Sequence, residues 1–375
     1  MADERIQRVT MPKWGLSMTS GTVTDWVAAE GEEVAKGADL AEIDTDKIVG
    51  TLEAAGDGVL RRVVVAAGSA APVGATIAVI APPEVPDAEV DAVVDAERAR
   101  LAAGAAEAEQ GPAAADVAVG GRSVAYASLG AGDGDPVLLV HGFGGDKNSW
   151  LFVQEPLAAD RRVIAVDLPG HGASGKDVGG GSLDELAAVL TGFLDAMGIE
   201  RAHVVGHSLG GAVAVAAAAR APERVRSLTL VAPAGVGTQI NADFLRGFAA
   251  ADTRKGLKPH LASLFADSAQ VNRRLVDDLL RYKRIDGVRQ ALDTLLGTLL
   301  DGDGPALDIA PLIAGVGVPV AAVWGAQDAV LPVGNADALP PSVRTRRVAG
   351  AGHMAHMEAP AEVRAAVEEA IAAAG

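Results

Sequence analysis

The sequence predicts two folded units, a small all-β unit followed by a larger α/β unit with a mostly parallel sheet. Residues 6–81 contain short strand-like runs separated by glycine, a pattern typical of a small β barrel or sandwich. From about Asp116 onward, apolar runs alternate with helical stretches, as buried strands of a parallel sheet do. The length of 375 residues also suggests two or three domains.

The strand-like runs of the first unit are residues 22–24, 40–43, 59–65 and 77–80. The apolar runs of the second unit are residues 136–140, 162–166, 202–205, 227–231 and 318–323. Residues 236–304 interrupt the second series with an almost purely helical segment. Because this segment would cover a site at the strand ends, we expect it to form a lid.

Composition excludes several classes of function. The chain carries 32 basic and 49 acidic residues, a net charge of −17, whereas nucleic-acid binding needs a basic face. Cysteine is absent, so disulfides, thiolate metal sites and a cysteine nucleophile are excluded, and we expect no metal site. The start of the chain lacks an apolar signal segment. We therefore expect a cytoplasmic protein that binds neither membranes nor nucleic acid.

An acidic segment rich in alanine and proline separates the two units. Between residues 84 and 116 there are nine acids against two arginines, which is typical of a solvated connector. Few large apolar groups are present to order residues 87–109, so we expect a partly helical tether. The predicted domains are residues 5–81, a linker at 82–118, and residues 119–375.

Lys47 lies between two strand-like halves, and Thr45-Asp46-Lys47 has the composition of a hairpin tip. Taken alone, an exposed lysine is usually an ordinary surface residue. Its context changes this interpretation, because the runs 11–18 (MPKWGLSM), 44–47 (DTDK) and 56–60 (GDGVL) occur in order. Together they resemble the lipoyl domain of 2-oxo acid dehydrogenase complexes over its whole length.

The resemblance implies a lipoyl-type barrel-sandwich whose hairpin lysine carries lipoic acid in amide linkage, and it puts that role on Lys47. A biotinyl domain shares this fold, but its lysine usually lies between methionines. Here the neighbours are Asp46 and Ile48, which favours the lipoyl interpretation.

Ser208 is the centre of a Gly-x-Ser-x-Gly motif, residues 206–210, which follows a β-branched run and precedes an alanine-rich helix. This strand–turn–helix context is what a nucleophile elbow requires. Upstream, the run 141–145 (HGFGG) follows a strand, as an oxyanion loop should. The backbone N–H groups of Phe143 and Leu209 would then stabilise an oxyanion.

Downstream, Asp328 follows a strand and His353 lies in the next loop, in a Gly-Ala-Gly-His setting. The order Ser, Asp, His is that of the α/β-hydrolase family, which residues 120–374 resemble along their length. The resemblance implies that Ser208 is the nucleophile, His353 the general base and acid, and Asp328 the orienting carboxylate.

Other residues could have taken these roles. His356 is one helical turn beyond His353, but the Gly-x-Gly-His setting favours His353. His141 and His207 are interpreted as structural members of their loops, and Asp167 as a turn residue after a strand.

The combination of a lipoyl-type unit with an α/β-hydrolase fold resembles the acetyltransferase component of acetoin dehydrogenase complexes. The resemblance implies acetyl transfer from lipoyl-Lys47 to coenzyme A. It also implies a thiamine-dependent acetoin dehydrogenase component and dihydrolipoamide dehydrogenase as partners, and a homo-oligomer. One departure from most such complexes is that the His-x-x-x-Asp-Gly signature of their acyltransferase domain does not occur.

Two rival functions remain open on the sequence alone: a hydrolase that has gained a lipoyl module, and a non-catalytic carrier or scaffold. Coenzyme A is anionic, so an acidic protein needs a local basic site to hold it. The run 281–284 (RYKR) in the lid is one candidate, and a solvated helix face is the alternative explanation of that run.

Overall fold

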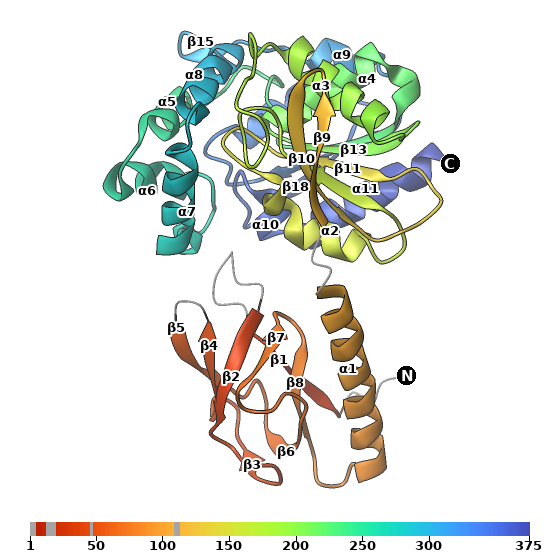
Figure 1. Ribbon diagram of the computed structural model, residues 1–375, viewed down its shortest axis with the longest axis vertical. Coiled ribbons are helices and arrows are strands. Elements are labelled where there is room, and N and C mark those ends of the chain that lie inside the picture. Colours follow the sequence, from red (N-terminus) through yellow and green to blue (C-terminus); the bar gives the residue numbers. More distant parts are fainter. Residues whose placement is uncertain (1–4, 13–19, 46–47, 109–112) are drawn as a thin grey trace. The chain divides into compact units, whose positions relative to one another are not determined.

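The computed structural model describes residues 5–12, 20–45, 48–108 and 113–375. These residues belong to two compact units, Met1–Gly111 and Pro112–Gly375 (Figure 1). Within the described ranges, no helix is both long enough and apolar enough to cross a membrane.

The N-terminal unit consists of two four-stranded sheets, as the strand-like runs predicted. One sheet has the order β1-β8-β6-β3 and the other β5-β4-β2-β7, and the neighbouring strands are antiparallel. The strands are β1 (Gln7–Thr10), β2 (Ser20–Trp26), β3 (Glu33–Val34), β4 (Asp39–Thr45), β5 (Ile48–Glu53), β6 (Gly58–Val63), β7 (Ser69–Pro72) and β8 (Thr76–Ala81).

Side-chain alternation builds the core of this unit. Along β4, Leu40, Ala41 and Ile43 are fully buried, whereas Glu42 and Asp44 are exposed. From Ala41 to Asp44 successive side chains point to opposite faces, as they do in a strand with one face on a core, and the irregular register between Asp39 and Ala41 allows Leu40 to be buried as well. The inward-facing residues form two packed clusters between the sheets.

Helix α1 (Asp87–Ala108) differs from the expected partly helical tether, because it packs on the N-terminal unit. Val90 and Val94, one turn apart, are buried against Val79 and Ala81 of β8. Ion pairs add to this contact, since Arg61 pairs with Asp87 and Arg62 with Asp91 at 2.6 and 2.9 Å. Two small valines and matched charges therefore order a segment that lacks large apolar residues.

The other end of the expected linker also differs. Strand β9 (Ala113–Val119) pairs antiparallel along its whole length with β10 (Arg122–Leu129). Residues 113–118 therefore belong to the sheet of the C-terminal unit. Backbone pairing at the edge of this sheet orders a run of alanines that has no strong strand pattern of its own.

The C-terminal unit contains an eight-stranded sheet with the order β18-β17-β14-β13-β11-β12-β10-β9. From β12 to β18 the neighbouring strands are parallel, and the pairs β10–β12 and β9–β10 are antiparallel. The five apolar runs correspond to five of these strands, so the predicted parallel sheet is confirmed. The parallel strands are β11 (Val137–Val140), β12 (Val163–Val166), β13 (Ala202–His207), β14 (Val225–Val231), β17 (Val320–Gly325) and β18 (Arg344–Val348).

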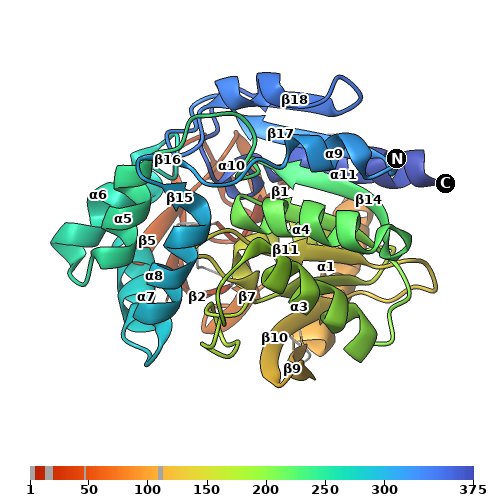
Figure 2. The same ribbon diagram turned by 90° about the horizontal axis from the view of Figure 1, so that it is seen from above.

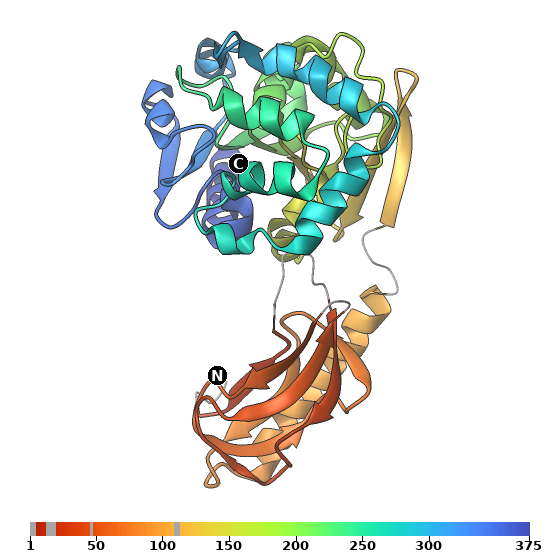
Figure 3. The same ribbon diagram turned by 90° about the vertical axis from the view of Figure 1, so that its left-hand side faces the viewer.

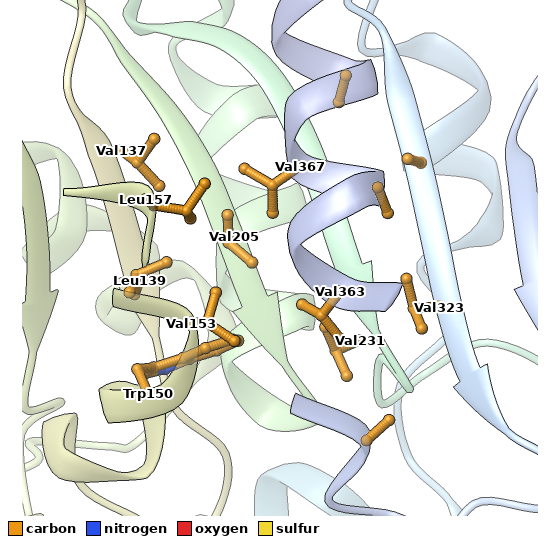
Figure 4. Close-up of a cluster of buried hydrophobic side chains, with 14 of the residues drawn as sticks. Val137, Leu139, Trp150, Val153, Leu157, Val205, Val231, Val323, Val363 and Val367 are labelled. Atoms are coloured by element: carbon orange, nitrogen blue, oxygen red, sulfur yellow. The ribbon is translucent and has the colours of Figure 1, made fainter. Parts of the chain in front are cut away.

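Helices cover both faces of this sheet (Figures 1 and 2). Those on one face are α3 (Leu183–Ala196), α4 (Leu209–Arg220) and α9 (Ala310–Gly315), and those on the other are α2 (Leu151–Leu157), α10 (Ala355–Glu358) and α11 (Pro360–Ala374). Figure 4 shows the core on the second face, where Val363 and Val367 of α11 pack against Val205, Val231 and Val323 of the strands. Burial on both faces explains why β11 and β12 are apolar throughout.

The predicted helical lid is confirmed between β14 and β17. It consists of α5 (Ala242–Ala250), α6 (Arg254–Ala262), α7 (Arg273–Lys283) and α8 (Val288–Leu299), which lie together on one side of the unit (Figure 3). Each of α5, α6 and α7 begins at an Asn or Thr whose side chain accepts a hydrogen bond from a backbone N–H in the first turn, the usual way to cap a helix.

Candidate active site

Ser208 lies at the turn between β13 and α4. Its backbone has φ 51° and ψ −118°, a conformation that non-glycine residues rarely adopt and that is costly unless its surroundings enforce it. The Ser208 N–H donates a hydrogen bond to the Val231 carbonyl of β14 at 2.9 Å. The side chain is 7% exposed. The turn therefore presents one nearly buried hydroxyl at the carboxyl end of the central strands.

Three glycines let this turn close. A Cβ at Gly206 would lie under 3.0 Å from backbone atoms of Gly210, and a Cβ at Gly210 would lie as close to the carbonyl oxygen of His141. A Cβ at Gly211 would lie 2.9 Å from the Pro233 side chain. Backbone atoms cannot move aside as a flexible side chain can, so Gly206 and Gly210 require glycine, and the rigid proline ring has the same effect at Gly211.

Asp328 and His353 are joined by a hydrogen bond. Asp328 follows β17, and its Oδ2 accepts a hydrogen bond from His353 Nδ1 at 2.8 Å. Its other oxygen, Oδ1, accepts from the N–H groups of Val330 and Leu331, both at 2.8 Å. Both side chains are buried. Two backbone amides therefore fix the position of the Asp328 carboxylate, and the carboxylate in turn fixes the orientation of the His353 ring.

His207, which directly precedes Ser208, connects the turn to His353. Its Nε2–H donates to the His353 carbonyl at 3.0 Å, and the two rings lie 4.6 Å apart. No hydrogen bond joins Ser208 Oγ to the His353 ring in the described part of the chain. Such bonds commonly tighten only when substrate binds.

His356 is placed differently from His353. It is fully buried between His207 and Trp150, with ring centroids 4.4 and 4.5 Å away. Neither of its ring nitrogens has a hydrogen-bond partner among the described residues. Burial, together with the neighbouring His353 and His141, lowers the pKa of His356 to about 3. The structure thus pairs Asp328 with His353 and keeps His356 as a neutral packing group.

The loop after β11 lies against Ser208. A Cβ at Gly142 would lie 2.9 Å from Ser208 Cβ, so the two residues are in close contact. Leu209 is the first residue of α4, and its N–H has no acceptor within the helix. Among the described residues, the Phe143 N–H has no hydrogen-bond partner. The sequence predicts these two amides as oxyanion donors, and neither donates a hydrogen bond to another described residue.

Two buried histidines hold this loop. The Gly144 N–H donates to His171 Nε2 at 3.0 Å, and the Leu168 N–H donates to His141 Nε2 at 3.0 Å. Burial lowers the pKa of His171 to about 3, with His141 contributing in the same direction. Both rings must accept a backbone hydrogen bond, so both act as neutral side chains.

Sequence reasoning missed the role of Asp167, which it interpreted as a turn residue. The carboxylate is fully buried and accepts hydrogen bonds from the backbone and the side chain of Lys147, at 2.7 and 2.8 Å, and from the Ala173 N–H at 2.8 Å. Burial opposes its ionisation, but the hydrogen bonds from Lys147 and from the Ala173 N–H lower the pKa of Asp167 overall. An acid at the end of a buried strand, beside a His-Gly loop, was the available signal.

Most side chains of the run 281–284 already have hydrogen-bond or ion-pair partners within the C-terminal unit. Arg281 pairs with Asp278, and Tyr282 Oη donates to the Gly170 carbonyl at 2.7 Å. Lys283 Nζ donates to the carbonyls at the end of α5. Of the four residues, only Arg284 has no such partner among the described contacts, so the run does not form a set of four available cations.

Lys47, the predicted lipoyl attachment site, lies outside the described residues. The strands on either side of it, β4 and β5, are described and pair with Thr45 opposite Ile48. The chain therefore has a lysine between two paired strands of the N-terminal unit, as the sequence predicted.

Comparisons with known proteins agree with this architecture. Residues 7–80 match the family model of biotin-requiring enzymes, and residues 135–360 match that of the alpha/beta hydrolase fold. The chain is 46% identical over 360 residues to the dihydrolipoyllysine-residue acetyltransferase component of the acetoin cleaving system from Pseudomonas putida, covering 96% of each chain. The corresponding component from Cupriavidus necator is 45% identical over 351 residues, covering 93% of each.

Solved structures resemble the C-terminal unit. A membrane phospholipase A superposes with a TM-score of 0.62 and 26% identity, over 74% of this chain and 92% of that one. A meta-cleavage product hydrolase from Pseudomonas fluorescens, with a TM-score of 0.62, 22% identity, and coverage of 70% and 98%, shows the shared fold alone. The two acetyltransferase components match nearly the whole chain. This protein therefore belongs to the family of dihydrolipoyllysine-residue acetyltransferase components of acetoin cleaving systems.

Proposed function

We propose that Ser208, His353 and Asp328 form a catalytic triad that transfers an acetyl group from the lipoyl group of Lys47 to coenzyme A. The observation that carries this proposal is the Asp328–His353 hydrogen bond beside the strained turn of Ser208. It occurs in a chain that also has a biotin/lipoyl-type unit. Lipoic acid in amide linkage to Lys47 would, in its reduced dihydrolipoyl form, supply the thiol that carries the acetyl group as a thioester.

In the first half of the reaction, His353 Nε2 takes the hydroxyl proton of Ser208, and Oγ attacks the thioester carbonyl carbon. The amides of Phe143 and Leu209 donate hydrogen bonds to the oxyanion that develops. As the carbon–sulfur bond breaks, His353 returns the proton to the departing sulfur. The acetyl group is then esterified to Ser208.

In the second half, the thiol of coenzyme A gives its proton to His353, and its sulfur attacks the acetyl carbonyl carbon. The bond to Ser208 Oγ breaks, and His353 returns the proton to the serine. The product is acetyl-coenzyme A and the free enzyme. Asp328 keeps the His353 Nδ1 protonated in both halves, which leaves Nε2 available to accept.

The same triad could pass the acetyl group to water, which would make the chain a hydrolase. Burial favours transfer, because Ser208 is 7% and His353 3% exposed, and a closed site limits the access of water to the acyl-enzyme. Fusion of the two units raises the effective concentration of the acyl donor near the triad. We therefore place transfer ahead of hydrolysis, and ahead of a non-catalytic carrier.

We also propose the partners that this chemistry requires. A thiamine-dependent acetoin dehydrogenase component would load the acetyl group, and dihydrolipoamide dehydrogenase would reoxidise the dithiol. The relatives' names as components of an acetoin cleaving system support such an assembly.

The test is to supply the acetyl-charged, lipoylated chain with and without coenzyme A and to measure both acetyl-coenzyme A and free acetate. We expect acetyl-coenzyme A to form and acetate to remain a minor product. The Ser208→Ala variant should lose the transfer by several orders of magnitude. Equal acetate release with and without coenzyme A would identify a hydrolase, and unchanged turnover in Ser208→Ala would identify a carrier.

A further inference from the structure

Phe248 is the lid residue that packs on the proposed oxyanion loop. It lies on α5 and is 2% exposed. A Cβ at Gly144 would lie under 3.0 Å from its ring atoms, so the ring rests directly on that glycine. The Phe248 and Phe143 rings meet edge to face, with centroids 5.9 Å apart. Phe248 therefore covers two consecutive residues of the loop.

The same loop reaches the nucleophile one residue earlier. Gly142 is in close contact with Ser208, since a Cβ there would lie 2.9 Å from Ser208 Cβ. Three consecutive residues, Gly142, Phe143 and Gly144, thus extend from the serine to the Phe248 ring. Phe248 is therefore the lid side chain that packs on the loop whose Phe143 amide donates to the oxyanion in the proposed mechanism.

Lys283, at the end of α7, holds Phe248 in place. Its Nζ donates to the carbonyls of Phe248 and Ala249, the latter at 3.0 Å, and lies 4.9 Å from the centre of the Phe248 ring. A cation at the last carbonyls of a helix is favourable, as is a cation over an aromatic face. One ammonium therefore fixes both the end of α5 and the ring that α5 carries.

We propose that Phe248 is a specificity-determining residue that limits the length of the acyl group accepted at Ser208, and that Lys283 is its positioning residue. This inference rests on the proposed role of Ser208 as the nucleophile. A large ring locked over the oxyanion loop leaves room for a short acyl group such as acetyl, and it excludes longer chains by overlap. Differences of this kind in an apolar pocket change kcat/KM by ~10–200-fold per methylene.

The experiment measures kcat/KM for 4-nitrophenyl acetate and 4-nitrophenyl hexanoate with the full chain, and also records labelling of Ser208 by a fluorophosphonate. In Phe248→Ala, the hexanoate-to-acetate ratio should rise by at least ~10-fold. Phe248→Leu, which keeps an apolar side chain, should give a smaller rise and guards against misfolding of the alanine variant.

Phe244→Ala is the matched control. Phe244 lies on the same helix, is 5% exposed, and has its ring 6.0 Å from that of Phe248. Among the described contacts it has none with residues 142–144. We expect the ester ratio of this variant to equal that of the wild type.

Lys283→Met tests the positioning role, because methionine fills similar space without the charge. The hexanoate-to-acetate ratio of kcat/KM should rise in Lys283→Met, whereas Lys283→Arg, which keeps the charge, should have the wild-type ratio. A purely structural role would lower both kcat/KM values equally. If Ser208 is labelled but the ratio does not change in Phe248→Ala and Phe248→Leu, this inference is wrong and the proposed function stands. If the wild type is not labelled and cleaves neither ester, both are wrong.

Discussion

Replacement of Asp328 by asparagine tests the triad with a minimal change in shape. Asp328 Oδ1 accepts two backbone N–H groups, from Val330 and Leu331. An amide NH2 group cannot accept them, so in the variant the remaining oxygen must stay at this position. The NH2 group then faces His353 Nδ1, which has to become a hydrogen-bond acceptor.

The consequence is a change of tautomer in His353. With Nδ1 accepting, the ring proton moves to Nε2, and Nε2 can no longer take the proton of Ser208. The corresponding change in a serine protease lowers kcat by ~10⁴-fold, or about 5 kcal/mol of transition-state stabilisation. We expect a loss of this size in acetyl transfer by Asp328→Asn.

The assay is single-turnover acetyl transfer to coenzyme A, accompanied by thermal unfolding to confirm that the variant is folded. Asp337→Asn is the matched control, because Asp337 is an exposed partner of Arg347 on the same unit and the chemical change is identical. Asp337→Asn should transfer at the wild-type rate. A folded Asp328→Asn that retained more than about a tenth of the wild-type rate would refute the tautomer argument.

Three further predictions concern the surroundings of the site. The pKa of His356 is about 3 in the folded chain against the usual 6.5, so the unfolded chain binds more protons between these values and stability falls with falling pH. At pH 5 this one residue lowers the free energy of unfolding by about 2 kcal/mol. Urea titrations at pH 8 and pH 5 should show that His356→Phe loses about that much less stability than the wild type between the two pH values. An equal loss in both proteins would contradict this. Gly210→Ala places a Cβ under 3.0 Å from the His141 carbonyl oxygen, so Tm should fall and fluorophosphonate labelling of Ser208 should drop by at least ~100-fold; labelling at the wild-type rate would count against the elbow. Burial lowers the pKa of Lys283 from 10.5 to about 8, with Arg289 adding to this and Asp252 and Asp293 opposing it. Between pH 8 and pH 10.5 the folded chain therefore binds fewer protons than the unfolded chain, so the free energy of unfolding of the wild type should rise relative to that of Lys283→Met. A difference between the two that stays constant over this pH range would refute the prediction.

The fold and the core of the site could be predicted because their signals are local in sequence. Gly206 and Gly210 flank Ser208 at fixed spacing, since the strained turn needs glycine on both sides. Asp328 and His353 each follow a strand end, and parallel strands bring such ends to one edge of the sheet.

What could not be predicted depends on contacts between distant segments. Asp167 is buried because Lys147, twenty residues earlier, donates two hydrogen bonds to it. In the sequence Lys283 is one of a run of basic residues, but in the structure its ammonium donates a hydrogen bond to the Phe248 carbonyl, 35 residues earlier, at the end of α5. Helix α1 is poor in large apolar residues, and it packs because Arg61 and Arg62 of the N-terminal sheets pair with its acids.

The most direct test of the account follows the acetyl group itself. The lipoylated chain is charged with radiolabelled acetyl, quenched within the first turnover, and digested, and the label is located by peptide mapping. The account predicts transient label on the peptide that contains Ser208, lost on addition of coenzyme A and absent in Ser208→Ala. Formation of labelled acetyl-coenzyme A without label ever reaching the C-terminal unit would contradict it.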